Sequence, residues 1–292
     1  MTACILVAAL AFTYSDAQSA YDTARELVEK HTPRDSGTPG GRAAAEFLLE
    51  QARKAAGASA PVSASLDEFE ENGKKYRNVT AGFEPVPNGE WLVFVSHFDT
   101  KPRTGCPGAN DGASTSGLLA AMLRAAVRAH PSESFPHNFL FVWTDGEECA
   151  GASYSECDGL AGSRRAAERL AKSGRRVKGV VCLDMLGDRD LFCTIPVNGS
   201  SRLRAAAFEA SRDCGVPLGD CFLVVTDDHV PFMEAGFEAI DIIDFEYGPA
   251  ASGGWWHTPR DTMDKIDAKS LFAAGRLAFS ISGRLAARRA PR

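Results

Sequence analysis

The sequence predicts an α/β fold, a single-domain three-layer αβα sandwich with a central mixed, mostly parallel sheet. Runs of apolar residues alternate with amphipathic helical patterns along the chain, as in sheets that helices cover. The run over residues 138–144 contains no charge, as expected of a strand covered on both faces. No linker or repeat divides the 292 residues, and a hydrophobic content of 45% can bury a substantial core.

Periodicity and turn residues predict each element in order. Apolar positions at helical spacing predict helices over residues 17–30, 42–56, 161–172, 201–212 and 268–288, and an Ala/Leu-rich helix that ends near His130. Short apolar runs predict strands over residues 77–83, 90–95, 138–144, 177–183, 222–225 and 239–243. A Pro-Asn-Gly turn is expected to join the first two strands.

Charge and hydropathy argue against two classes of partner. The net charge is −6 and no Lys/Arg-rich block stands out, so we expect no nucleic-acid partner. The longest apolar stretch, residues 4–12, is too short to span a bilayer. We expect a monomer without a membrane span.

Residues 1–20 are a candidate signal peptide or N-terminal segment that precedes a domain over residues 21–292. Residues 4–12 resemble the apolar region of a signal peptide, and Asp16-Ala-Gln-Ser-Ala20 is a candidate cleavage region. Met1-Thr-Ala carries no Lys or Arg, so a buried first helix or strand is the alternative. We expect a periplasmic or secreted protein, and a cytoplasmic location stays open.

The eight cysteines form no CxxC pair and no zinc-finger spacing. Cys214 and Cys221 flank a Gly-Val-Pro-Leu-Gly turn and are the first pair to test for a disulfide. Free buried thiols are the alternative.

Acidic and histidine residues gather where the predicted strands end. Ligands of open α/β sheets bind beyond the carboxyl ends of the strands. Carboxylates and imidazoles that converge there without a nearby Lys or Arg would repel one another, and a divalent cation such as zinc removes that cost. The candidate residues are His97, Asp99, Asp111, Glu147, Glu148, Asp184, Asp227, Asp228 and His257.

Glu147 and Glu148 are the most informative pair. They follow an apolar strand and a Gly, and neighbouring side chains at a strand end point in different directions. One carboxylate can therefore coordinate a metal while the other acts as a general base or acid.

An ordered set of motifs resembles the M28 zinc peptidase family. The motifs are His97-Phe-Asp99, Asn110-Asp111-Gly-Ala-Ser114, Asp145-Gly-Glu-Glu148, Leu183-Asp184-Met and Trp256-His257-Thr258. The resemblance extends from about residue 20 to the end of the chain. It implies a zinc-dependent enzyme that acts on the N-termini of peptides or proteins, either a one-zinc glutaminyl-peptide cyclotransferase (glutaminyl cyclase) or a two-zinc aminopeptidase.

Several stretches are more similar to the cyclase branch, among them Ser96-His-Phe-Asp-Thr-Lys101 and Asp227-Asp-His-Val-Pro-Phe232. That resemblance implies that Asp111, Glu148 and His257 bind zinc and that Glu147 transfers the proton. It also implies an acidic network of Asp184 and Asp227, and substrate contacts from Trp256, Tyr154 and Asp241. Asp241 stands where animal cyclases carry a His, and Tyr154 stands near the place of a Trp.

The peptidase reading stays open because all five ligands of a two-metal site are present. These are His97, Asp111, Glu148, Asp184 and His257. In a peptidase Asp111 would bridge the metals and Glu147 would activate a water molecule. His97 would bind the second metal in a peptidase and only contact the ligands in a cyclase. A non-catalytic binding domain of the same fold is the third reading.

Overall fold

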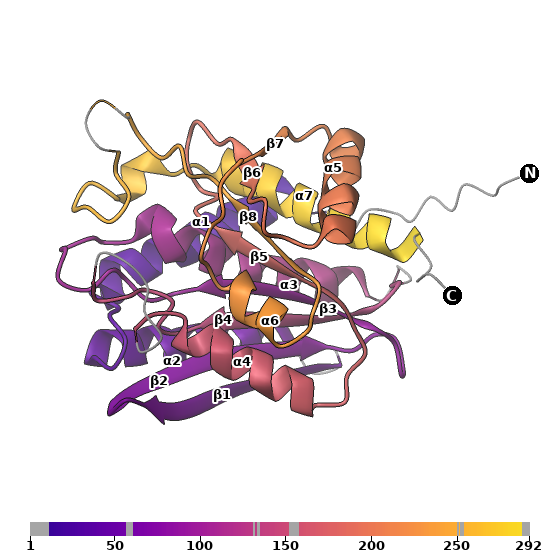
Figure 1. Cartoon of the computed structure of the whole chain (residues 1–292), viewed down its shortest axis with the longest axis horizontal. Helices are drawn as coiled ribbons and strands as arrows, with labels where there is room; N and C mark the ends of the chain where they lie inside the picture. Colours follow the sequence, from indigo (N-terminus) through magenta and orange to yellow (C-terminus); the bar gives the residue numbers. More distant parts are fainter. Residues whose placement is uncertain are drawn as a thin grey trace, which may run out of the picture.

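A computed structural model of the chain describes residues 12–56, 61–130, 132, 135–151, 158–249, 251 and 254–287. It contains one eight-stranded sheet between two layers of helices, which is the predicted three-layer sandwich (Figure 1). The strands are β1 (Val62–Glu71), β2 (Lys74–Phe83), β3 (Trp91–His97), β4 (Asn138–Thr144), β5 (Val177–Asp184), β6 (Cys193–Ile195), β7 (Leu218–Asp220) and β8 (Ala239–Ile243).

The helices cover both faces of the sheet. They are α1 (Tyr14–His31), α2 (Pro39–Ala56), α3 (Thr115–Ala129), α4 (Ala161–Lys172), α5 (Ser201–Cys214), α6 (His229–Glu234) and α7 (Ala268–Ala287), with a π-helical turn η1 (Ala109–Ser114) and a 3₁₀ turn η3 (Met263–Lys265). Helices α1, α2, α3, α5 and α7 form the larger core on one face. Helices α4 and α6 cover the other face. Along β3, Leu92 and Phe94 enter the first core while Val93 and Val95 enter the second, which explains the unbroken apolar runs.

The strand order, β1-β2-β4-β3-β5-β8-β6-β7, places a crevice at the end of β3. Strands β4, β3, β5 and β8 run parallel in the centre of the sheet. The chain passes from β3 through α3 to β4, and then through α4 to β5 on the other side of β3. Because α3 and α4 lie on opposite faces, a crevice is expected beyond the carboxyl end of β3, where His97 lies.

The Pro87-Asn-Gly89 turn joins β2 to β3 as predicted, but these two strands do not pair with each other. Strand β4 lies between β2 and β3 and pairs with each. The connecting loop crosses the end of β4, where the Asn138 side chain accepts from Val86 N–H (2.9 Å) and donates to Val86 O (3.0 Å). The hairpin of this region is β1–β2, which turns at Asn72-Gly73 with positive φ at both residues. Strand β1 was not predicted, and Asn-Gly is the signal that could have indicated it.

The strand predicted over residues 222–225 is wrong. This segment is a loop in which Phe222, Leu223 and Val224 are exposed. The edge position belongs instead to β7, which pairs with β6. An apolar run alone does not distinguish a buried strand from an exposed loop.

Cys214 and Cys221 are both free thiols in the structure, so the disulfide considered for them is absent. Residues 1–11 lie outside the described residues, and Asp16 to Ala20 lie inside helix α1. Export and cleavage near Ala20 stay predictions. Among the described residues, no helix is long and apolar enough to cross a membrane.

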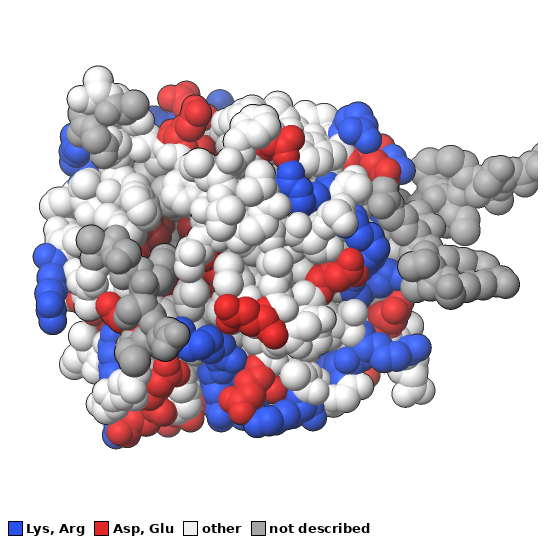
Figure 2. Space-filling view, in the orientation of Figure 1, with Lys and Arg blue, Asp and Glu red and all other residues white. Residues whose placement is uncertain are grey.

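Charges of both signs are interspersed over α4 and β1 (Figure 2). Arg165 and Arg169 of α4 both pair with Asp67 of β1, at 3.0 and 3.2 Å. Arg164 pairs with Glu71 at 2.6 Å. These ion pairs hold α4 against the edge of the sheet, although exposed pairs each contribute little to stability.

Replacing Asp16 with Ala should destabilise the fold. Asp16 forms a capping box with Thr13 and accepts two hydrogen bonds from Arg128 of α3. Burial opposes the charge, but the bonds from Arg128 and Thr13 outweigh burial and lower the pKa of Asp16 below its usual 3.8. We expect Asp16→Ala to lower the free energy of unfolding in urea by about 1–2 kcal/mol.

The matched control is Asp22→Ala, which removes an exposed pair with Arg25 on the same helix and should cost less than about 0.5 kcal/mol. The pKa of the Asp16 carboxyl group is lower in the folded protein than in the unfolded chain. Its contribution to the free energy of unfolding is therefore fully present above the unfolded-state pKa, and it is lost as the pH falls through the folded-state pKa. Equal effects of the two variants at neutral pH would contradict this account.

Candidate active site

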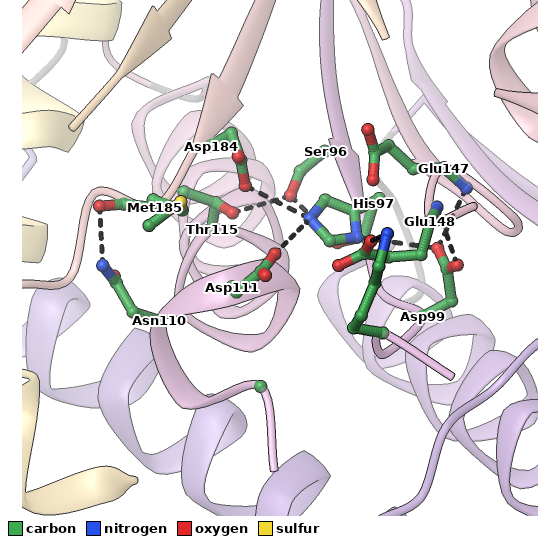
Figure 3. Close-up of polar contacts among 12 residues, drawn as sticks. Ser96, His97, Asp99, Asn110, Asp111, Thr115, Glu147, Glu148, Asp184 and Met185 are labelled. Carbon is green, nitrogen blue, oxygen red and sulfur yellow. Dashed lines mark hydrogen bonds and ion pairs between the residues drawn. The ribbon is translucent and has the colours of Figure 1, made fainter. Parts of the chain in front are cut away.

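The predicted acidic and histidine residues converge beyond the carboxyl ends of β3, β4 and β5 (Figure 3). His97 ends β3, Glu147 and Glu148 follow β4, and Asp184 ends β5. Asp111 reaches the same place from the turn η1. All five side chains are nearly inaccessible to solvent.

Asp111, Glu148 and His257 form one candidate metal centre. His257 Nε2 lies 3.0 Å from Glu148 Oε1 and 3.4 Å from Asp111 Oδ2. Among the described residues, Asp111 Oδ2 and Glu148 Oε1 accept no well-formed hydrogen bond, although both atoms are buried. Buried carboxylate oxygens without donors are costly, and a divalent cation would satisfy them. The three residues therefore fit zinc.

His257 is prepared to act as a neutral ligand. Burial, with a smaller contribution from the charge of Lys101, outweighs the attraction of Asp111 and lowers the pKa of His257 to about 4. The imidazole therefore keeps a lone pair for a metal near neutral pH.

His97, Asp111 and Asp184 form a second candidate cluster that shares Asp111 with the first. His97 Nε2 lies 3.1 Å from Asp111 Oδ1 and 3.2 Å from Asp184 Oδ1 (Figure 3). Burial opposes a charge on His97, but its contacts with Asp111, Asp184 and Asp99 outweigh burial and raise its pKa well above 6.5. This arrangement is compatible with a second metal and with a simple hydrogen-bonded contact.

The backbone around Asp111 is fixed by two residues that the sequence did not single out for this purpose. Gly112 has φ = 88°, and a Cβ atom there would lie 2.9 Å from His97 Cε1. Only Gly therefore brings η1 this close to the imidazole. The carboxylate of Asp261 accepts from the N–H groups of Asn110 (2.8 Å) and Asp111 (3.1 Å). No local spacing relates Asp261 to η1, because the contact exists only in the folded chain.

Asp99 has a wider role than orienting His97. Its Oδ1 lies 3.5 Å from His97 Nδ1, as the His-x-Asp pattern predicts. The same carboxylate accepts from the N–H groups of Glu147 (3.2 Å) and Glu148 (3.1 Å). Asp99 thereby ties the loop after β4 to the end of β3 and fixes the directions of the two Glu side chains.

Glu147 lines the cavity next to the candidate metal ligands. Burial, together with the charges of Glu148, Asp227 and Asp228, outweighs the attraction of His97 and raises the pKa of Glu147 well above 4.5. A carboxyl group with a raised pKa holds a proton more readily than an ordinary Glu, which suits a general acid or base. Asp184 and Asp227 line the same cavity, which brings the predicted acidic network together.

The expectation that no cation lies near the carboxylates is wrong. Lys101 is buried, and its Nζ lies 3.3 Å from Glu148 Oε2 and donates to Cys149 Sγ at 3.1 Å. Burial disfavours its charge, but Glu148 outweighs burial and raises the pKa of Lys101 above its usual 10.5. Lys101 therefore engages one oxygen of Glu148 while the other oxygen faces His257.

The cavity above these residues has a volume of about 280 Å³. Trp256 lines it and stacks on His257 with ring centroids 3.8 Å apart, as expected of a pocket wall. Asp241 does not line it. This residue is fully buried in β8, on the face that α6 covers, and its contact with a substrate stays a prediction. Tyr154 lies outside the described residues.

A larger cavity, of about 520 Å³, lies between α4 and the β1–β2 hairpin. Its charged lining residues include Asp67, Arg165 and Arg169, which pair with one another. It is lined by no His or Cys among the described residues, so the chemistry that the sequence predicts belongs to the smaller cavity.

Comparisons with known proteins agree with this geometry. Residues 78–282 match the model of peptidase family M28. Aminopeptidase YwaD of Bacillus subtilis is 29% identical over 193 residues, which cover 64% of this chain and 39% of YwaD. The chain thus matches well under two thirds of the length of that relative.

Among solved structures, a glutaminyl cyclase of an Acidobacteriales bacterium is similar with a TM-score of 0.82 and 29% identity, covering 94% of this chain and 96% of that one. A leucine aminopeptidase precursor of Bacteroides thetaiotaomicron shares the fold with a TM-score of 0.74 and 22% identity, covering 91% and 96%. Because the family match spans well over half of the sequence, the chain belongs to peptidase family M28 and is an enzyme of either the glutaminyl cyclase or the metallopeptidase kind.

Proposed function

We propose that this protein is a zinc-dependent glutaminyl-peptide cyclotransferase, which converts an N-terminal Gln of a peptide to pyroglutamate with release of ammonia. The observation that carries the proposal is the likeness to a bacterial glutaminyl cyclase over nearly the whole of both chains. Asp227 and Trp256, from motifs of that branch, line the cavity, and Lys101 contacts Glu148 beside it, which agrees with the proposal.

Asp111, Glu148 and His257 would hold one zinc ion. When bound, zinc acts as a Lewis acid that polarises the γ-carboxamide carbonyl of the substrate. Lys101 engages Glu148 Oε2, so Glu148 is oriented to offer Oε1 to the metal side. Asp261 fixes the backbone of Asp111 from behind.

Glu147 would move the proton. The α-amine nitrogen of the substrate forms a bond to the γ-carbon, and the bond from that carbon to the amide nitrogen breaks. Glu147 accepts the proton that the attacking amine loses and donates it to the amide nitrogen, which leaves as ammonia. The backbone bonds from Glu147 and Glu148 to Asp99 hold the carboxyl group at the cavity wall. The acidic lining from Asp184 and Asp227 favours an N-terminal amine.

A two-zinc aminopeptidase is the second candidate. The cluster of His97, Asp111 and Asp184 favours it, because Asp111 could bridge two metals. The sequence likeness to YwaD points the same way. In that reading Glu147 would take a proton from a water molecule that attacks the first peptide bond.

A paired assay separates the two functions. Purified protein with zinc is incubated with a Gln-initiated peptide and, separately, with a Leu-initiated peptide of equal length. We expect ammonia release and a mass loss of about 17 units, one ammonia, from the first peptide, because cyclisation eliminates the side-chain amide nitrogen. Free Leu from the second peptide without ammonia from the first would establish the aminopeptidase instead.

Glu147→Gln should abolish turnover while zinc stays bound, because Gln fills the same space but cannot accept the proton. We expect kcat to fall by at least about 100-fold, with an unchanged zinc content by atomic absorption. Glu234→Gln, on the exposed part of α6, is the matched control and should retain full activity. Retained turnover in Glu147→Gln would refute the assigned role.

Removing zinc should lower the thermal stability of the protein. Chelation leaves the buried carboxylates of Asp111 and Glu148 without their cation, and binding to the folded state at 1,000 times Kd is worth about 4 kcal/mol. We expect a clear fall in Tm on chelation of the wild type and of a His130→Ala control, and a much smaller fall in His257→Ala. Equal chelator shifts in His257→Ala and the wild type would place the metal elsewhere.

A further inference from the structure

Exposed apolar side chains gather beside the mouth of the catalytic cavity. Phe222, Leu223 and Val224, in the loop between β7 and α6 (Figure 1), are 83%, 62% and 75% exposed. Leu223 and Val224 also line the cavity, together with the exposed Phe245 and Trp256. We call these five residues the apolar rim. They are five of the nine large hydrophobic side chains that are exposed in the described part of the chain.

The loop that carries this rim is tied to the fold on both sides. The carbonyl of Leu223 accepts from Val197 N–H at 3.0 Å, and Cys221 N–H donates to Ile195 O at 3.0 Å. The side chain of Asn198 accepts from Val225 N–H (3.1 Å) and donates to Val225 O (2.8 Å). The backbone is therefore anchored to the segment after β6, and it presents the three apolar side chains outward from a fixed position.

A cluster of exposed apolar residues at the edge of a cavity marks a binding surface. Within the rim, Phe245 packs edge-on against Trp256 with ring centroids 6.0 Å apart. Among the described residues, the titratable ones that line the cavity are those of the site itself: Asp111, Glu147, Glu148, Asp184, Asp227 and His257. The bottom of the cavity is therefore polar, which suits an amine and a carboxamide, and its entrance is apolar.

The size of the cavity indicates what covers the rim. At about 280 Å³ it lies at the small end of ligand pockets, so the N-terminal residue fills most of it. The rest of an extended peptide leaves through the mouth at about 3.3 Å per residue. Its second and third side chains must then pass Leu223 and Val224.

We propose that the apolar rim binds the second and third residues of the substrate and selects peptides in which these residues are apolar. The proposal rests on the function proposed above, in that a peptide N-terminus occupies the cavity, and it applies to cyclisation and to hydrolysis alike. Apolar side chains gain by covering the exposed rim, whereas polar or charged ones lose hydration there without a partner.

The test measures binding separately from chemistry. Gln-Leu-Leu-amide and Gln-Ser-Ser-amide are titrated by calorimetry into zinc-loaded Glu147→Gln protein, in which turnover is blocked. We expect the Leu peptide to bind about tenfold more tightly. In the background of Glu147→Gln, the change Leu223→Ser with Val224→Ser should reduce the ratio of the two affinities to below about threefold. Tyr14→Ser, an exposed aromatic residue on α1, is the matched control and should leave the ratio unchanged.

Equal affinities for the two peptides, no measurable binding of either, or a ratio that survives the double substitution would overturn the proposal. Ammonia release by the wild type decides the proposed function separately. If the wild type binds the Leu peptide more tightly but releases no ammonia, the role of the apolar rim in peptide binding is supported and the cyclase activity is contradicted. Both substituted side chains, Leu223 and Val224, are mostly exposed, so we expect the Tm of the double variant to equal that of its parent. An unchanged Tm would show that the variant is folded.

Discussion

The crowding of buried carboxylates at the end of β3 is the constraint on which the rest of the structure depends. Asp111, Glu148 and Asp184 are almost inaccessible to solvent. Asp184 lies against His97, Glu148 lies against His257, and Asp111 contacts both imidazoles. Such a group of like charges is stable only with a cation, good hydrogen-bond donors or bound protons. The fold supplies part of this compensation through Lys101, which contacts Glu148, and a divalent metal at Asp111, Glu148 and His257 would supply the rest.

Much of the architecture could be predicted because it depends on local pattern. Helix α4 and strand β8 lie where periodicity placed them, since amphipathic helices and buried strands leave plain signatures. The residues of the site could be found because each follows an apolar strand or lies in a Gly-containing turn. The neighbour of each strand could not be found, because pairing is decided by long-range packing. This is why β4 separates β2 from β3 despite the intervening Pro-Asn-Gly turn.

The contacts that support the site could not be predicted for the same reason. The Asp261 carboxylate accepts a hydrogen bond from the backbone N–H of Asp111, although 150 residues separate the two in the sequence. Lys101, after β3, contacts Glu148, after β4. The loop over residues 222–225 illustrates a different limit. Its apolar run satisfies the pattern of a strand, yet the structure leaves it exposed beside the cavity, where apolar surface is useful for binding rather than for packing. Asp241 shows the converse, because a polar residue expected at the substrate is enclosed in the sheet.

The account as a whole depends on one zinc ion held by Asp111, Glu148 and His257. Diffraction from crystals grown with zinc, recorded on both sides of the zinc absorption edge, locates the metal directly. One anomalous peak within about 2.3 Å of ligand atoms from these three residues is the predicted result. A second peak of similar height between His97 and Asp184 would contradict the one-zinc cyclase and establish the two-metal site of a peptidase.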